Sequence, residues 1–250
     1  MVLQTDAPYT LELLKVTGMI PETVQLLKRW VSGMSAQQLA QVAIAEDLLG
    51  KASASRVKDL VYDGFGKRYL RPGEHVASSL KTLVESGVPL ATLRQLLFIH
   101  TCRQQALLRD SLTDVYWPKS REGRSIITPD EIRGFILSAF GTGRAPRRWS
   151  DSIVARLTRL LPKCLTDFGL VGPFRPAGRD ILPFRIEDFT VLYLAHEAHF
   201  SGAGDTPILF LPVILRMASS SSRPFQESLQ ESMPWRPASQ PRRVRERIGS

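Results

Sequence analysis

Hydrophobic side chains recur at a spacing of three and four residues along most of the chain, which is the period of a helix with one buried face. Between Asp151 and Phe168 this spacing gives one stripe, made of Ile153, Leu157, Leu160, Leu161, Cys164 and Phe168. Pro162 interrupts the stripe, and because proline lacks a backbone N–H we expect a kink there. The pattern predicts a mainly α-helical protein, arranged as a helical bundle.

Capping residues indicate where individual helices begin. Ser35 is followed three residues later by Gln38, and Thr128 by Glu131, so both positions have the sequence of a capping box. Pro129 stands at the first helical position after Thr128, where helices favour proline. Together with the hydrophobic period, these signals predict helices that start at 35 and 128 and helices over about residues 21–33, 53–69, 75–87, 89–110, 151–168 and 187–202.

The tripeptide Asp167-Phe168-Gly169 also occurs in protein kinases, where its aspartate holds a metal ion. The other parts of a kinase are missing, because no Gly-rich phosphate loop, strand lysine or catalytic-loop asparagine accompanies it. Phe168 completes the apolar stripe, and Gly169 stands where helices often end in a left-handed residue. We therefore interpret this tripeptide as the end of a helix.

Two short apolar arms follow this helix end, at residues 170–174 and 181–184. Between them, the order Arg175-Pro176-Ala177-Gly178 suits a β-turn with proline second and glycine fourth. A helix, a hairpin and a further helix from Glu187 form the outline of a winged helix. The sequence therefore predicts a C-terminal winged-helix-like unit with one short β-hairpin.

A second candidate motif covers residues 35–69, which have the dimensions of a helix-turn-helix-like pair. Short hydroxyls and basic side chains gather at the start of its second helix, where they could meet phosphates or base edges. These residues are Lys51, Ser53, Ser55, Arg56 and Lys58. Any two packed helices of a bundle have similar dimensions, and Asp59 and Asp63 dilute the charge, so an ordinary helix pair is the alternative.

Composition suggests where the chain divides. The polar and basic segment WPKSREGRSII, at 117–127, predicts a linker between an N-terminal helical domain (1–116) and a C-terminal winged-helix-like domain (128–218). Residues 219–250 begin with four serines and are rich in Ser, Pro, Gln and Arg. Because so few apolar residues could offset the entropy of ordering this tail, we expect it to be disordered.

Charge points to the class of partner. The formal net charge is +9 at pH 7, and residues 141–186 hold nine Lys or Arg against three Asp. A surplus of this kind favours a polyanion, and phosphate contacts give affinity without reading sequence. The candidate contacts in this region are Arg144, Arg147, Arg148, Arg156, Arg159, Lys163, Arg175 and Arg179. Because Arg156, Arg159 and Lys163 are three and four residues apart, they share one helix face.

We therefore predict a protein that binds double-stranded DNA. The alternative is a helical adaptor whose basic surface docks an acidic partner protein without touching nucleic acid. For the charged helix face itself, the plain alternative is a solvated surface with some intramolecular ion pairs and no partner.

Other chemistry is weakly represented in the sequence. His196 and His199 are one residue too close for the zinc-binding helix motif, and no Walker loop or nucleophile elbow is present. Cys102 and Cys164 are far apart in sequence, which fits a reduced cytoplasmic protein without a disulfide framework. The apolar run at 208–215 has 8 residues, less than half of a membrane span. We predict no enzymatic activity, no metal or other cofactor, and no membrane association.

Two stretches carry a family resemblance: EDLLGKASASRVKDLVYDGFGKRYL, from Glu46, and WSDSIVARLTRLLPKCLTDFGLV, from Trp149, with the hairpin that follows. Over about residues 9–216 the chain resembles the BrxA family of the bacterial BREX phage-exclusion systems. The resemblance implies a mostly helical fold that is similar in part to the antitermination factor NusB, DNA binding, and work beside other BREX components. It implies no catalytic residues, and the serine-rich segment after Ala218 departs from the family pattern.

Overall fold

A computed structural model describes residues 8–50 and 52–200, with the backbone alone at 198–200. The expected tail at 219–250, the apolar run at 208–215 and Lys51 lie outside these residues. Within them the predicted mainly helical fold is confirmed, and one small antiparallel sheet of two strands accompanies the helices. In the described part of the chain, no helix combines the length and the apolar character that crossing a membrane requires.

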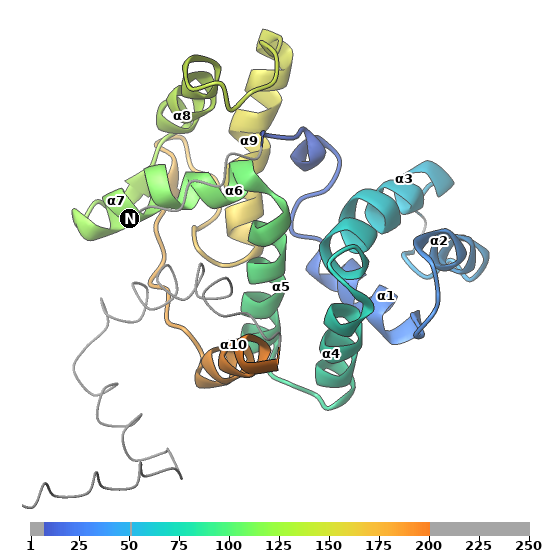
Figure 1. The fold of residues 1–250 in the computed structure, drawn as a ribbon. Coiled ribbons are helices and arrows are strands. Elements are labelled where there is room, and N and C mark those ends of the chain that lie inside the picture. Colours follow the sequence, from blue (N-terminus) through green and yellow to red (C-terminus); the bar gives the residue numbers. More distant parts are fainter. Residues whose placement is uncertain (1–7, 51, 201–250) are drawn as a thin grey trace, which may run out of the picture.

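The first half of the chain packs around one long helix. Figure 1 shows the N-terminal helices gathered on one side of α5, which runs through the middle of the molecule. The elements of this half are η1 (Glu12–Leu14), α1 (Ile20–Arg29), α2 (Ala36–Ala45), α3 (Ala54–Lys58), η2 (Asp59–Leu70), α4 (Glu74–Glu85) and α5 (Leu90–Gln104). The buried residues of α5 lie on all sides of the helix, as expected of a helix with neighbours all round it.

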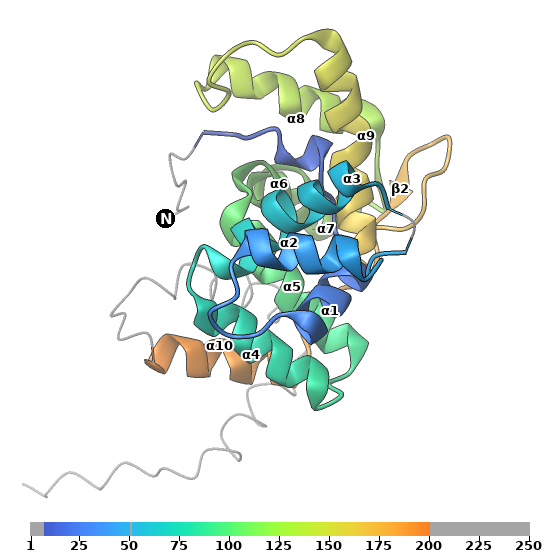
Figure 2. The same ribbon diagram turned by 90° about the vertical axis from the view of Figure 1, so that its right-hand side faces the viewer.

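The second half places two helices at one end of the molecule. Figure 2 shows α8 and α9 at this end, with α4 and α10 at the other. The elements are α6 (Ala106–Ser111), η3 (Leu112–Tyr116), α7 (Trp117–Arg121), β1 (Ile126–Ile127), α8 (Pro129–Gly141), α9 (Asp151–Asp167), β2 (Arg179–Asp180) and α10 (Asp188–Phe200). Residues 117–127, predicted to be a linker, thus contain α7 and β1, while the division into two domains stays a prediction.

The predicted capping boxes are confirmed. The Ser35 hydroxyl accepts a hydrogen bond from the backbone N–H of Gln38, whose side chain accepts one from the Ser35 N–H. Thr128 and Glu131 make the same reciprocal pair at the start of α8. Each pair satisfies backbone groups that a helix start leaves without partners, so these two helix starts could be located from the sequence.

Two helices differ from their predicted course. The helix expected over 53–69 begins as α3 and continues as η2, whose backbone is wound as a π-helix. The helix expected over 89–110 breaks at Gln105, which adopts an extended backbone (φ −119°, ψ 92°) and separates α5 from α6. Apolar residues continue on both sides of this break, so the hydrophobic period alone does not reveal it.

The buried face of α9 follows the predicted stripe only in part. Leu157, Leu161 and Cys164 are buried as expected, whereas Ile153 and Leu160 are only half-buried. The helix also buries Val154 and Leu165, which lie beside the expected stripe. Pro162 lies within the helix, at a buried position.

The end of α9 confirms the interpretation of Asp167-Phe168-Gly169. Gly169 has a φ of +80°, in the left-handed region that favours glycine. Its N–H donates to the Thr166 carbonyl at 2.9 Å, and the Leu170 N–H donates to the Leu165 carbonyl at 3.0 Å. These two bonds form a Schellman motif, which satisfies the last carbonyl groups of the helix.

Replacing Gly169 by valine is expected to lower the free energy of unfolding by about 1–3 kcal/mol, because a β-branched side chain is strained at positive φ. The midpoint of urea unfolding measures this change. Gly134 provides the control, since it lies within α8 and an added Cβ there would point into open space. If Gly134→Val destabilises the protein as much as Gly169→Val, the left-handed cap is not the cause.

The predicted β-turn is also confirmed, and its second arm has an additional partner. Arg175 and Gly178 exchange two backbone hydrogen bonds of 2.9 Å across Pro176 and Ala177. The arms are joined again where the Gly172 N–H donates to the Asp180 carbonyl at 2.8 Å. On its other side, β2 pairs antiparallel with β1, so that Ile126 faces Asp180 and Ile127 faces Arg179.

Candidate nucleic-acid interface

The exposed face of α9 carries the row of cations that the helical spacing predicts. Arg156 and Arg159 are exposed, and neither makes a hydrogen bond or an ion pair within the described residues. Lys163 continues the row with a side chain that is 52% exposed, and its Nζ lies 3.1 Å from Asp167 Oδ1. Since an exposed pair of this kind contributes little to stability, Lys163 is available to a competing anion.

The hairpin beside α9 holds two more of the predicted residues (Figure 2). Arg175 is exposed and pairs with Asp180 at 2.9 Å. Arg179 is half-buried, and its Nη1 donates to Thr166 Oγ1 at 3.0 Å and to the Gly172 carbonyl at 3.1 Å. Burial lowers the pKa of Arg179. These contacts tie the hairpin to the end of α9, so Arg179 positions the hairpin.

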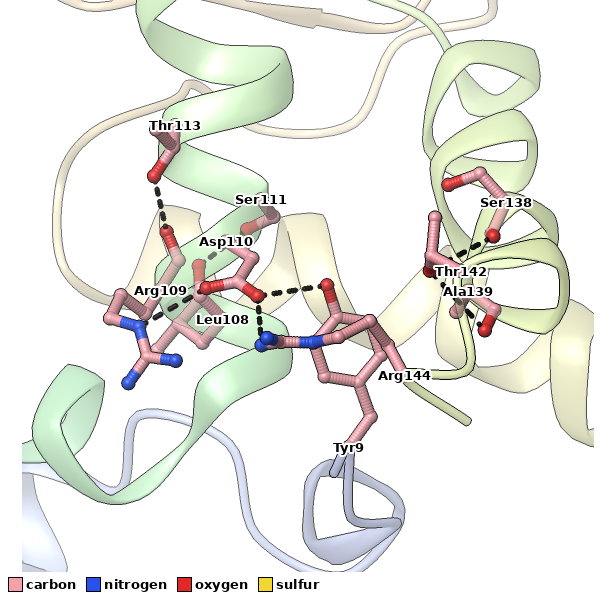
Figure 3. A network of polar contacts seen from close by, with 10 residues as sticks. All are labelled: Tyr9, Leu108, Arg109, Asp110, Ser111, Thr113, Ser138, Ala139, Thr142 and Arg144. Carbon is pink, nitrogen blue, oxygen red and sulfur yellow. Dashed lines mark hydrogen bonds and ion pairs between the residues drawn. The ribbon is translucent and has the colours of Figure 1, made fainter. Parts of the chain in front are cut away.

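Arg147 and Arg148 are exposed in the loop between α8 and α9, whereas Arg144 is turned inward. Figure 3 shows the Arg144 guanidinium and the Tyr9 hydroxyl converging on the Asp110 carboxylate. The side chain of Arg144 is only 13% exposed, and its guanidinium lies 4.9 Å from the centre of the Tyr9 ring. Arg144 therefore joins distant segments of the fold and does not lie on the exposed basic surface.

Asp110 is the centre of this network. One of its oxygens accepts from the Tyr9 hydroxyl at 3.0 Å and from Arg144, while the other accepts from Arg109 Nε at 3.1 Å. Burial, followed by the negative charge of Asp110, raises the pKa of Tyr9. The sequence did not reveal the network, because Tyr9 and Asp110 are separated by 101 positions.

The N-terminal candidates lie on the short helix α3. Ser53 caps this helix by accepting from the Arg56 N–H at 3.2 Å, and Ser55 and Lys58 are exposed. The Arg56 guanidinium donates to the Lys15 carbonyl. Although α2 and α3 contact each other, a helix-turn-helix use of this pair stays a prediction.

The nearby acids have partners inside the fold. Lys15 Nζ lies 2.8 Å from Asp63 and 3.5 Å from Asp59, and Lys67 Nζ lies 2.6 Å from Asp63. Burial acts against ionisation of Asp63, but the hydrogen bonds from Lys15 and Lys67 outweigh it and lower the pKa of this carboxyl. These ion pairs neutralise the two aspartates that dilute the charge of the motif.

One cavity connects the two candidate regions. Arg56 and Lys163 both line a space of about 650 Å³, together with Arg94, Glu22 and Asp167. The structure thus brings the start of α3 near the C-terminal end of α9, which the sequence could not predict. The acids and bases of this cavity are mixed, in contrast to the exposed middle of α9.

The sequence profile of the BrxA family matches residues 7–198, which is most of the chain. The chain belongs to the BrxA family. This membership implies a component of a BREX phage-defence system, associated with other BREX components. The predicted resemblance is therefore confirmed.

The other comparisons concern curated proteins and solved structures. No curated protein matches the sequence. The crystal structure of an uncharacterized protein from Magnetospirillum magneticum is similar, with a TM-score of 0.61 and 18% sequence identity. The similarity covers 76% of this chain and 94% of the other. At this identity, the likeness shows a shared fold alone.

In this member of the BrxA family, the predicted cations thus fall into three groups. The exposed group lies on α9, the loop before it and the hairpin, and consists of Arg147, Arg148, Arg156, Arg159, Lys163 and Arg175. A second group supports the fold, through Arg144 in the Asp110 network and Arg179 at the hairpin. The third group, around α3, lies across a cavity from the end of α9.

Proposed function

We propose that this BrxA family member binds double-stranded DNA without catalysing a reaction, through the exposed face of α9 and the adjoining hairpin. The observation that carries the proposal is the pair Arg156 and Arg159, two exposed guanidiniums on one helix face without partners among the described residues. Exposed arginines in such a row suit the phosphates of a duplex.

The order of elements supports a winged-helix use of this unit. A strand (β1) precedes α8 and α9, a hairpin follows them, and the hairpin's second arm pairs back to β1. In this arrangement α9 takes the place of the recognition helix, whose first turns enter the major groove, and the hairpin takes the place of the wing. Two buried free cysteines, Cys102 and Cys164, fit work in a reduced cytoplasm.

The proposal predicts that Arg156→Ala with Arg159→Ala weakens duplex binding for all sequences alike. The slope of log affinity against log salt concentration should become shallower by about 0.9 for each lost phosphate contact. Electrophoretic mobility shift or fluorescence anisotropy over a salt series measures both quantities. Arg179 is left unchanged, because its contacts with Thr166 and Gly172 hold the hairpin in place.

The matched control is Arg71→Ala with Arg121→Ala, which removes the same charge from two exposed positions away from α9. Equal losses of affinity in the two double variants would mean that overall charge, and not the α9 face, attracts DNA. A wild-type protein that binds no duplex even at low salt would contradict the proposal and favour the adaptor that docks an acidic partner protein.

A further inference from the structure

A groove of about 570 Å³ lies between the start of α8, the face of α9 and the hairpin. Its floor is apolar, with Ile127, Pro129, Ile132, Leu160 and Pro162 among the lining residues. The size falls in the range of pockets that bind small organic molecules.

The charged residues that line the groove are all basic. Arg159, Lys163 and Arg179 line it, and none of its described lining residues is acidic. The cavity near Arg56 differs in this respect, because Glu22 and Asp167 line it beside the bases. An apolar floor with cations beside it and no carboxylate is suited to an occupant with a flat apolar part and a negative charge.

Phe174 adds an aromatic face to this groove. Its side chain lines the groove and yet the residue is 63% exposed. The guanidinium of Arg179 lies 5.8 Å from the centre of the ring and is held by its own hydrogen bonds to Thr166 and Gly172. Single exposed apolar residues are ordinary, but this ring adjoins an apolar groove and has a fixed cation beside it.

The polar groups of the groove favour stacking on the flat face of a nucleobase over hydrogen bonding to its edge. The Thr158 hydroxyl already donates to the Val154 carbonyl, and the Thr128 hydroxyl bonds to Glu131. Few neutral donors and acceptors therefore remain to read a particular base. Stacking on an aromatic ring needs none of them, because every nucleobase has a π-face.

We propose that this groove takes a single nucleotide unstacked from the DNA, with its base against Phe174 and its phosphate beside Arg159 and Lys163. The inference rests on the proposed DNA binding and specifies a preferred substrate, a duplex that contains an unpaired nucleotide. Such a nucleotide has already left the stack, so the protein does not have to unstack it.

The test compares a fully paired duplex with the same duplex carrying one unpaired thymidine. The full-length protein should bind the bulged duplex about 5- to 150-fold more tightly, which is the range of one base–aromatic stacking contact. Phe174→Ala should remove this preference, and Phe174→Trp should keep it. Leu192→Ala is the control, because Leu192 is also 63% exposed but lies on α10. Unfolding curves check that each variant is folded.

The outcomes separate this inference from the proposed function. Two results would show that the groove does not bind an unpaired nucleotide. One is that Phe174→Ala keeps the preference for the bulged duplex. The other is that the wild type has no such preference while it still binds paired duplex with full salt dependence, in which case DNA binding itself stands. An acidic peptide would then be the remaining occupant. The last measurement is the binding of thymidine monophosphate at the same concentrations. Binding of this monophosphate as tight as binding of the bulged duplex would overturn the assignment to DNA and make the groove a site for free nucleotides.

Discussion

Replacing Asp110 by alanine is expected to lower the free energy of unfolding by about 3–5 kcal/mol. This is the usual effect of removing one partner from a buried ion pair. The substitution takes the carboxylate away from Arg144, whose side chain is 13% exposed, and from Arg109. It also leaves the Tyr9 hydroxyl without its acceptor. Because the network joins the N-terminal segment, α6 and the loop after α8, its loss affects three regions at once. Urea unfolding followed by circular dichroism measures the change.

Asp114 offers a matched control, since it is a nearby acid that is exposed. Burial and the negative charge of Asp110 raise the pKa of Asp114, so Asp114→Ala removes a repulsion and should not destabilise the protein. Combining Asp110→Ala with Arg144→Met should be less destabilising than the sum of the two single variants, because the second change removes the buried unpaired charge. Additive effects in this cycle would show that the two side chains do not stabilise each other.

His100 is expected to make the protein less stable in acid. It is buried in α5, its Nε2 lies 3.2 Å from the Tyr193 hydroxyl, and burial followed by the charge of Arg103 lowers its pKa from 6.5 to about 3. Between these two values the unfolded chain binds a proton that the folded protein does not. The stability that neutral His100 contributes is therefore complete above pH 6.5 and falls with pH, by about 1.4 kcal/mol per unit, until the pH approaches 3.

The measurement is the free energy of unfolding from pH 7 to pH 4, compared between the wild type and His100→Gln. Glutamine has no proton to gain, so the variant should lose this part of the pH dependence even if it is less stable at neutral pH. His75→Gln tests the neighbouring charge: the charge of the exposed His75 helps to lower the pKa of His100, so this variant should keep most of the slope. If His100→Gln also keeps the full slope, the acid sensitivity comes from other groups.

The features that sequence predicted well depend on neighbours in the chain. A capping box needs two residues three positions apart, and the end of α9 needs a glycine after the last apolar contact, so Ser35, Thr128 and Gly169 could be assigned correctly. The exposure of Arg156 and Arg159 also follows from the helical period, because both lie opposite buried positions of one helix. What these arginines bind is a separate question, addressed by the salt series above.

The features that sequence missed depend on residues far apart in the chain. Arg144 looked like one more exposed cation, and only the fold brings Asp110 and Tyr9 to it. The strand β1 has two residues, too few for an alternating pattern, and its partner β2 lies beyond two helices. The groove beside Phe174 likewise combines side chains from β1, α8, α9 and the hairpin, so no single segment predicts it.

The pairing of β1 with β2 has a mechanical consequence. β1 ends at Ile127, and the next residue, Thr128, caps α8. No further linker residue therefore separates the sheet from the first turn of that helix. A ligand that displaces the hairpin therefore pulls on α8 as well. The loop with Arg147 and Arg148 begins beyond the far end of α8. The hairpin and this loop therefore lie at opposite ends of one helix, which connects them through β1.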